Sequence, residues 1–530
     1  MGTCRARDVH DERRRLARFR RGRREAAKPR RRASSGDGRR RDGTAAGHHD
    51  AGSRRAHRAR ARAFDTGAQV HLGPLIRPAS LGLALCLLAA ACGPGSTSGV
   101  TSSSRTSTPT PSPPISAEWV EYHRDAGRSG VGPAEPALTT PAVAWRTSVD
   151  GDVYASPLIV AGHVIVATEN NTVYSLDLFT GSVVWKVHLG DPVDASSLPC
   201  GNIRPVTGIT GTPAADPASG RVYVVGFLRG QHHMLYSLSL VDGSTVWQRD
   251  VDPSGSNPAV QQQRGALAIA SGFVYVPLGG LFGDCGAYHG YVVGVSLNGA
   301  PAAAYLVPSS RGAGIWSPQG VTVGADGNVY VVSGNSTSGS GFGNSNSVIQ
   351  LSPDLQTVRS YFAPSNWAAL NASDTDLGSV GATLLSNGLV MAIGKDGVAY
   401  VLRAGSLGAI GGQLVSRKVC SGAWGGTASS GSDVYVPCAD GLFALSITAS
   451  SIDIRWFAGS PVLGSPIISA GAIWAIEPSS ATLFALDPAT GHVLFRTSLG
   501  SAEHFSTPAA TDGFVVAPAG SSVVAVSVVG

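Results

Sequence analysis

Apolar and polar residues alternate in short segments along most of the chain after residue 118, and turns rich in glycine or proline separate the segments. The stretch VYSLDLFTGSVVW at 173–185 is typical, because two alternating segments flank a Thr-Gly pair. This pattern predicts a β-hairpin. Close variants return as LYSLSLVDGSTVW at 235–247 and LFALDPATGHVLF at 483–495, so one hairpin is encoded repeatedly.

A second hairpin pattern precedes these segments. Several copies open with Ser-Pro or Thr-Pro, where proline can begin a strand without losing a ladder hydrogen bond. With weaker copies, eight such segments can be counted: 156–168, 212–226, 266–277, 317–333, 381–394, 426–438, 465–477 and 507–518. Repeats of roughly 40 to 65 residues with four strands each are typical of propeller blades. We predict an all-β fold, an eight-bladed β-propeller of four-stranded antiparallel blades.

The two ends of the repeat region predict how the ring closes. The chain ends at VVAVSVVG with no outer strand after it, whereas VAWRTSV at 143–149 stands alone before the first unit. We expect this N-terminal strand to complete the eighth blade, so that the propeller occupies residues 118–530. Tryptophans near the outer strands are expected to be core residues that pack between blades; they are Trp145, Trp185, Trp247 and Trp456.

Charge is distributed unevenly along the chain. Residues 1–62 hold 22 of the 41 Lys and Arg residues and 7 of the 35 Asp and Glu residues, which leaves 19 basic and 28 acidic residues in the remainder. A propeller with that balance has no electrostatic footprint for a phosphate backbone, so we expect no nucleic-acid partner. The Arg-rich segment has few large apolar residues, and this composition predicts disorder.

Residues 70–92 have the pattern of an export signal. Arg77 precedes the apolar run LGLALCLLAAA at 81–91, which is short for a membrane-spanning helix and ends in small residues. Because alanines stand directly before Cys92, the segment resembles a bacterial lipoprotein signal, in which that cysteine becomes the lipidated first residue. We expect an extracytoplasmic protein that is either anchored to the cell membrane through Cys92 or secreted.

The segments on either side of the signal complete the domain organisation. Residues 93–117 are rich in Ser, Thr and Pro, a composition typical of an extended linker. An export signal acts at an N-terminus, so we expect translation to start near Val70 and residues 1–69 to lie outside the exported protein. A real basic cytoplasmic extension is the alternative.

Four cysteines lie within the predicted propeller, and an even number in an exported chain favours disulfides. Cys420 precedes an inner strand and Cys438 ends the strand that would pair with it. Cys200 and Cys285 occupy comparable places on neighbouring blades. Of three possible connectivities we predict Cys200 with Cys285 and Cys420 with Cys438, each joining loops on one face. Four buried reduced thiols are the alternative.

The phrase L-D-x-x-T-G-x-x-x-W, present in LDLFTGSVVW at 176–185 and in LDPATGHVLF with Phe495 at its end, resembles the pyrroloquinoline quinone (PQQ) type propeller repeat. The resemblance covers about 119–530. It implies two groups of proteins: quinoprotein alcohol dehydrogenases, and non-catalytic propellers such as the lipoprotein scaffold of the outer-membrane assembly machine. The repeat is structural in both groups and does not separate them.

Three central segments resemble the quinoprotein cofactor site. By this resemblance, Trp316 in 312–335 would stack on the quinone and Asn335 would bind Ca²⁺. Asp374 or Asp376 would be the catalytic base, with one of them near the metal. Lys395 would hold the quinone oxygens. These residue types suit alcohol oxidation, which needs a flat aromatic ring, a hard cation with oxygen ligands and a carboxylate base.

The sequence also departs from the quinoprotein pattern. The adjacent cysteine pair of the best-known enzymes is absent, since Cys200 stands alone, and the segment 224–239 contains no acid where the family has a glutamate ligand. No C-x-x-C-H haem motif occurs, so we expect no haem and an external electron acceptor. Two functions remain open. The favoured one is a propeller that binds an unknown small molecule or protein partner at its funnel, and the other is a PQQ- and Ca²⁺-dependent alcohol dehydrogenase.

Overall fold

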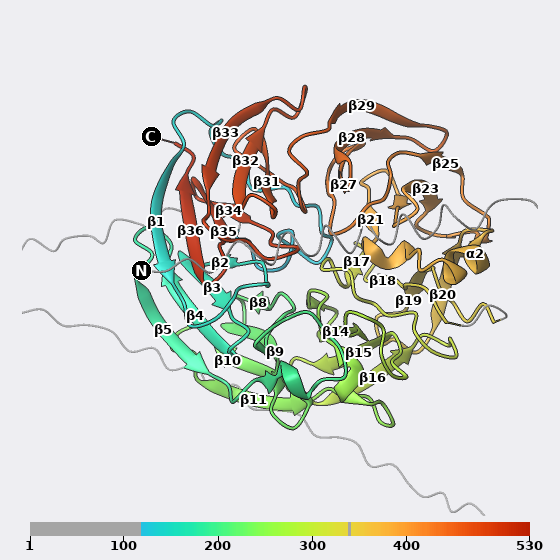
Figure 1. Ribbon diagram of the computed structural model, residues 1–530, viewed down its shortest axis with the longest axis horizontal. Coiled ribbons are helices and arrows are strands. Elements are labelled where there is room, and N and C mark those ends of the chain that lie inside the picture. The colour runs from blue at the N-terminus through green and yellow to red at the C-terminus, as the bar shows by residue number, and fades with distance from the viewer. Residues whose placement is uncertain (1–117, 338–340, 530) are drawn as a thin grey trace, which may run out of the picture. The chain divides into compact units, whose positions relative to one another are not determined.

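The computed structural model describes residues 118–337 and 341–529 (Figure 1). The signal peptide, the lipidation site Cys92 and the linker expected from the sequence lie outside the described residues. Within them, no helix combines the length and the apolar character needed to cross a membrane.

The described residues form eight antiparallel sheets arranged as the blades of a propeller, which confirms the predicted fold (Figure 1). Each blade runs from an inner to an outer strand. Blades one to four contain β2 (Leu158–Val160), β3 (His163–Ala167), β4 (Thr172–Asp177), β5 (Val183–His188); β8 (Ala214–Asp216), β9 (Arg221–Leu228), β10 (His232–Ser239), β11 (Thr245–Asp250); β12 (Gln261–Gln262), β13 (Ala268–Ala270), β14 (Phe273–Gly280), β15 (Tyr291–Ser296), β16 (Pro301–Leu306); and β17 (Thr322–Val323), β18 (Val329–Val332), β19 (Val348–Leu351), β20 (Val358–Ala363).

The second half of the ring follows the same plan. Blades five to eight contain β21 (Thr383–Leu384), β22 (Leu389–Ala392), β23 (Val398–Arg403), β25 (Val415–Lys418); β26 (Ala428–Ser430), β27 (Asp433–Cys438), β28 (Gly441–Ile447), β29 (Ile452–Ala458); β30 (Ile467–Ser469), β31 (Ala472–Glu477), β32 (Thr482–Leu486), β33 (Val493–Ser498); and β34 (Ala509–Thr511), β35 (Phe514–Pro518), β36 (Ser522–Ser527), β1 (Ala142–Ser148). Outside the blades lie β6 (Val193–Asp194), β7 (Val206–Thr207), α2 (Trp367–Ala372), η1 (Ala195–Ser197), η2 (Pro258–Val260) and η3 (Leu377–Ser379).

The ring closes as predicted, because β1 supplies the outer strand of blade eight. It pairs antiparallel with β36, from Ala142 opposite Ser527 to Ser148 opposite Ser522. One irregularity was not predicted: β24 (Ala409–Ile410), which lies between β23 and β25 in the chain, pairs in parallel with β20 and widens blade four.

The repeated phrase L-D-x-x-T-G-x-x-x-W builds the contact between neighbouring blades. Gly181 has φ +71°, and a Cβ there would lie 2.6 Å from the ring of Trp145 in the preceding blade. The Nε1 of Trp145 donates a hydrogen bond to the carbonyl of Leu178 at 2.7 Å. Asp177 fixes the turn by accepting from the backbone and hydroxyl of Thr180. Trp185, Trp247 and Trp456 repeat this contact, so the predicted packing between blades is confirmed.

An antiparallel meander places its connections on two opposite faces. The links between strands one and two, and between three and four, lie on what we call the turn face. They are short, except that the link between β23 and β25 contains β24. The links between strands two and three, and from each outer strand to the next inner strand, lie on the loop face.

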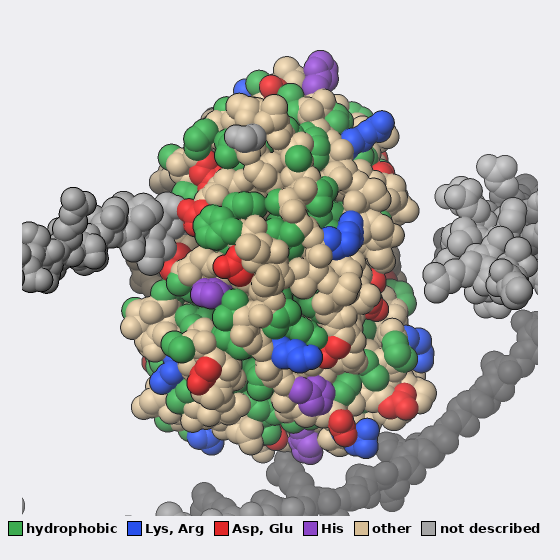
Figure 2. Space-filling model, turned by 90° about the vertical axis from the view of Figure 1, so that its left-hand side faces the viewer, with side chains coloured by type: hydrophobic (Ala, Val, Ile, Leu, Met, Phe, Trp, Pro, Cys, Tyr) green, Lys and Arg blue, Asp and Glu red, His purple; other side chains and the backbone are tan. Residues whose placement is uncertain are grey.

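Figure 2 shows the side of the ring that carries β1 and β5, where basic and acidic side chains are interspersed and no single charge dominates.

Residues 118–136 form a strap along the turn face that the sequence did not reveal. The strap makes backbone hydrogen bonds with the inner strands of blade after blade, beginning with the pair Trp119 and Ile159. Its main side-chain anchor is Arg128, which is 1% exposed and contacts Glu121 at 2.9 Å and the carbonyls of Val321 and Leu267 at 2.9 and 2.6 Å. The strap therefore closes the turn-face end of the central channel.

Candidate functional site

A cavity of about 330 Å³ opens on the loop face of the described residues. Connections from blades two to six and from blade eight line it, since this is the face where the long loops converge. All five residues named from the family resemblance lie on its wall: Trp316, Asn335, Asp374, Asp376 and Lys395. The structure therefore brings together residues that are up to 79 positions apart in the chain.

The polar centre of the cavity is the contact between Lys395 and two aspartates. The Nζ of Lys395 lies 2.5 Å from Oδ2 of Asp376 and 3.5 Å from Oδ1 of Asp374. Asp376 is buried, and its Oδ1 accepts a hydrogen bond from the backbone N–H of Asn335 at 2.6 Å. Burial opposes the charge of Lys395, but attraction by Asp376 and Asp374 outweighs it and raises the lysine pKa.

The two aspartates differ in environment. The side chain of Asp374 is 64% exposed, whereas that of Asp376 is 5% exposed. Partial desolvation raises the pKa of Asp374 although Lys395 opposes the shift. Asp374 also adopts φ +52°, a conformation that asparagine and aspartate tolerate better than most residues. Asp374 is therefore the carboxylate that a ligand in the cavity would reach first.

Trp316 forms part of the cavity wall beside the lysine. The Nζ of Lys395 lies 5.7 Å from its ring centroid, within the range of a cation–π interaction. Two glycines leave room for this arrangement. A Cβ at Gly279 would lie 2.9 Å from Cβ of Trp316, and one at Gly334 would lie 2.3 Å from Oδ1 of Asp376. Any side chain at these positions would displace the site.

Sequence reasoning missed the other wall of the cavity. Arg264 lies over the ring of Phe505, with 4.7 Å from its guanidinium carbon to the ring centroid, and its Nη2 donates to the carbonyl of His504 at 3.4 Å. Its Nε is buried without a hydrogen-bond partner among the described residues. Burial lowers the pKa of Arg264. Trp424 adds a further aromatic ring to the wall.

These missed residues share a register that the sequence does contain. Arg264, Trp424 and Phe505 each stand four residues before the first residue of an inner strand. Tyr154, Thr210 and Pro318 have the same spacing and line a small cavity in the channel, where they meet Arg264 and Phe505. Alignment of the blades on their inner strands would therefore have pointed to the axis-facing residues.

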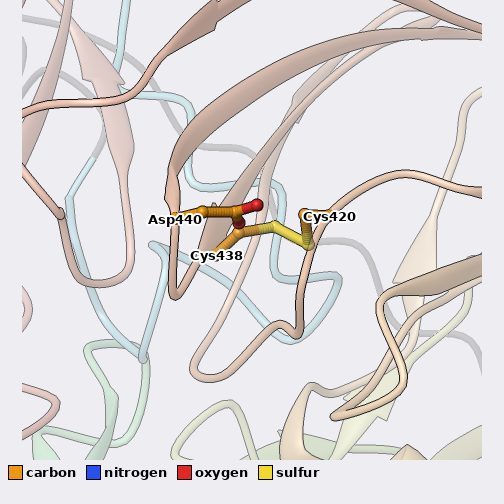
Figure 3. A group of neighbouring side chains, drawn as sticks. All are labelled: Cys420, Cys438 and Asp440. Carbon is orange, nitrogen blue, oxygen red and sulfur yellow. A yellow bond between two sulfur atoms is a disulfide. The ribbon is translucent and has the colours of Figure 1, made fainter.

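Both predicted disulfides are present and hold loops of the loop face. Cys200–Cys285 joins the connection before blade two to the loop of blade three that lines the cavity at 281–284. Cys420–Cys438 joins the connection before blade six to the end of β27 (Figure 3). Asp440 lies beside this disulfide and accepts from the backbone N–H of Ser421 at 3.1 Å. Because the two sulfurs are bonded to each other, this group does not offer a thiolate metal site.

The segment 224–239 does not reach the cavity, although the resemblance placed a metal ligand there. None of its residues lines the wall. Arg229 pairs with Asp191, and His233 pairs with Asp252. The basic residues of blade two therefore neither supply nor repel an ion at the cavity.

The comparisons with known proteins agree with this architecture. A PQQ-type family model, described as outer membrane protein assembly factor BamB, matches residues 137–276. The chain has a PQQ-like β-propeller. No curated protein matches.

The PQQ-like propeller resembles solved structures over most of its length. The quinohemoprotein alcohol dehydrogenase from Comamonas testosteroni has a TM-score of 0.61 at 15% identity, covering 78% of this chain and 80% of that chain. A europium-containing methanol dehydrogenase has a TM-score of 0.59 at 14% identity, and the match covers 76% of this chain and 89% of that chain. BamB from Moraxella catarrhalis has a TM-score of 0.50 at 13% identity, and the match covers 73% of this chain and 98% of that chain. At these identities the similarity shows a shared fold.

Proposed function

We propose that this PQQ-like propeller is an exported binding protein whose loop-face cavity takes a flat organic anion. The observation that carries the proposal is Arg264, whose guanidinium faces the cavity over Phe505 and whose buried Nε has no hydrogen-bond partner among the described residues. A buried N–H of a guanidinium without an acceptor is costly, and a ligand carboxylate would satisfy it. The rings of Trp316 and Trp424 add apolar surface for a planar molecule.

Export is part of the same proposal. Two disulfides within one propeller are stable in an oxidising compartment and rare in the cytosol. They support an extracytoplasmic location, in line with the export signal expected from the sequence.

PQQ is a flat, multiply charged anion, and the aromatic and basic side chains of the cavity suit such a molecule. Trp316 would contact the ring system, and Arg264 and Lys395 would meet its negative oxygens. The donor set for calcium fits less well. Calcium prefers six to eight oxygen ligands, whereas both carboxylates already contact the ammonium of Lys395 and one accepts from Asn335. A divalent ion would have to displace that ammonium, so we propose binding without a resident calcium ion.

A second function, PQQ-dependent alcohol oxidation, is favoured by the convergence of all five family-like residues on one cavity. Bound PQQ would supply two-electron oxidation. On the protein side, Asp374 has the exposure needed to accept a hydroxyl proton from a substrate. Lys395 would remain close enough to stabilise the negative charge that develops on the substrate oxygen.

The test is a titration of the purified chain with PQQ, with and without Ca²⁺, followed by absorbance. We expect saturable binding that does not need Ca²⁺ and that weakens at least about tenfold in Arg264→Gln, a loss of one charge-assisted hydrogen bond. Arg249→Gln, at an exposed arginine of β11, is the matched control. No binding of PQQ or of other planar carboxylates would refute the proposal. Reduction of an artificial dye with an alcohol panel, abolished in Asp374→Asn, would establish the enzyme instead.

A further inference from the structure

A second cluster of ligand-type side chains lies on blade two, apart from the cavity wall. His232 begins β10, Asp250 ends β11 and Asp252 follows two residues later. The antiparallel register, in which Met234 faces Asp250, brings His232 level with Asp252. One ligand atom from each of the three residues lies within 4.8 Å of the others. None of them lines the loop-face cavity.

The distances from the imidazole of His232 to the two carboxylates are longer than those of typical hydrogen bonds. The Nδ1 of His232 lies 3.4 Å from Oδ2 of Asp250 and 3.7 Å from Oδ2 of Asp252. Ligand atoms bonded at about 2.1 Å to one tetrahedral metal ion lie about 3.4 Å apart. The two distances from His232 are therefore close to those expected between ligand atoms of one ion, and the two carboxylate oxygens lie within 4.8 Å of each other.

The neighbouring histidine provides an internal comparison. His233 is 1% exposed, and its Nδ1 lies 2.7 Å from Oδ1 of Asp252, a true hydrogen-bond distance. Its ring stacks on Phe227 with 4.3 Å between centroids, and its backbone N–H donates to Oδ2 of Asp252 at 3.0 Å. Carboxylates that ligate metals are themselves hydrogen-bonded by residues behind them, and His233 does this for Asp252. Asp252 is thus held in place from behind while His232 stays on its open side.

The charge of the cluster also calls for a cation. Among the ion pairs of the described residues, neither Asp250 nor Asp252 contacts a lysine or arginine. Two neighbouring carboxylates without a lysine or arginine partner repel each other, and a divalent ion removes that repulsion. An imidazole beside two carboxylates suits first-row transition metals better than calcium.

We propose that His232, Asp250 and Asp252 bind one divalent transition-metal ion, with Zn²⁺ as the preferred species. His232 and Asp250 are half exposed, with side-chain exposures of 58% and 48%. Three protein ligands and an open side leave the remaining coordination to water or to a group from outside. The site does not depend on the function proposed for the cavity.

The test is isothermal titration of the purified chain with Zn²⁺, paired with the visible absorption of a Co²⁺ complex. We expect one site whose affinity falls at least about tenfold in His232→Ala and in Asp252→Asn, together with loss of the Co²⁺ bands. His492→Ala removes an exposed histidine of blade seven near Asp487 and is the matched control, so it should leave both signals unchanged.

Because His232 is exposed, loss of metal binding in His232→Ala can be distinguished from loss of the fold. Without metal, circular dichroism should show the same melting temperature for His232→Ala and for the wild-type chain. Zn²⁺ should raise the melting temperature of the wild-type chain but not that of His232→Ala. Absence of binding at submillimolar Zn²⁺, or equal binding by wild type and His232→Ala, would overturn the proposal.

Discussion

The Nζ of Lys395 lies 2.5 Å from Oδ2 of Asp376, and the two residues come from different loop-face connections of blade five. The aspartate is buried and the lysine is 22% exposed. The pair therefore decides how the charge of the cavity is balanced, and it links the stability of the loops to whatever the cavity binds.

Replacing Lys395 by alanine should destabilise the chain by about 2 to 3 kcal/mol, because the buried carboxylate of Asp376 loses its partner. Urea denaturation would measure the change. Lys418→Ala, at an exposed lysine of the same blade, should change the free energy of unfolding by less than about 0.5 kcal/mol. Equal effects of the two variants would contradict a structural role for the pair.

Gly334 should not tolerate a methyl group. Its Cβ would lie 2.3 Å from Oδ1 of Asp376 and 3.1 Å from Nε1 of Trp316. We expect Gly334→Ala to cost about 2 kcal/mol through this overlap and to weaken ligand binding in the cavity. Gly405→Ala meets nothing within 4 Å and serves as the control. The idea fails if both variants bind and unfold like the wild-type chain.

Glu169 should make the stability of the propeller depend on pH. Burial raises its pKa from 4.5 to about 7, although the N–H of Gly208 donates to its Oε2 at 2.6 Å. The folded state therefore binds this proton more tightly than the unfolded state, and stability falls as pH rises from about 4.5 to about 7. A difference of this size corresponds to about 3 kcal/mol.

The measurement for Glu169 is the free energy of unfolding at several pH values, compared with Glu169→Gln. The glutamine does not titrate but keeps an oxygen for the N–H of Gly208. The wild-type chain should lose stability relative to the variant across this window. A constant difference between pH 4 and pH 8 would show that the shift is wrong.

Arg128 should be the most sensitive side chain of the strap. Its guanidinium contacts Glu121 and the backbone carbonyls of Tyr122, Val321 and Leu267. Arg128→Met should cost about 3 to 5 kcal/mol, because it leaves Glu121 buried without its partner. The double variant with Glu121→Leu should recover much of this loss, and thermal denaturation of the three proteins would show it. No recovery would mean that the carbonyl contacts carry the cost.

Much of the architecture could be predicted from the sequence because the blades repeat. The turn Thr180-Gly181 and the preceding Trp145 form a contact that recurs along the ring, so strand periodicity and turn chemistry point to the same fold. The cavity residues Trp316, Asp376 and Lys395 converge because connections of one type lie on one face. Their grouping thus followed from topology, whereas their chemical roles remain predictions.

The features that were missed break the repeat or depend on packing across the ring. The strap around Arg128 lies before the first blade and has no strand periodicity. The pairing of β24 with β20 joins an insertion of one blade to the edge of another. Arg264 shares its position before an inner strand with Phe505 and Trp424, but the residue types differ. These three residues are equivalent only in their position relative to the inner strand, and a search for conserved residue types in the repeats does not detect that position.

The closure of the ring by β1 and β36 also governs how the chain acquires its fold. Ala142, near the beginning of the propeller, pairs with Ser527, near its end. Contacts between such distant segments form slowly, because a long loop must close first. Until the last strand is available, β1 has no partner and blade eight shows an open edge, the kind of edge that pairs with other chains. Assembly of this protein is therefore completed only when β36 is available, and removal of residues 522–530 would leave its first strand without a partner.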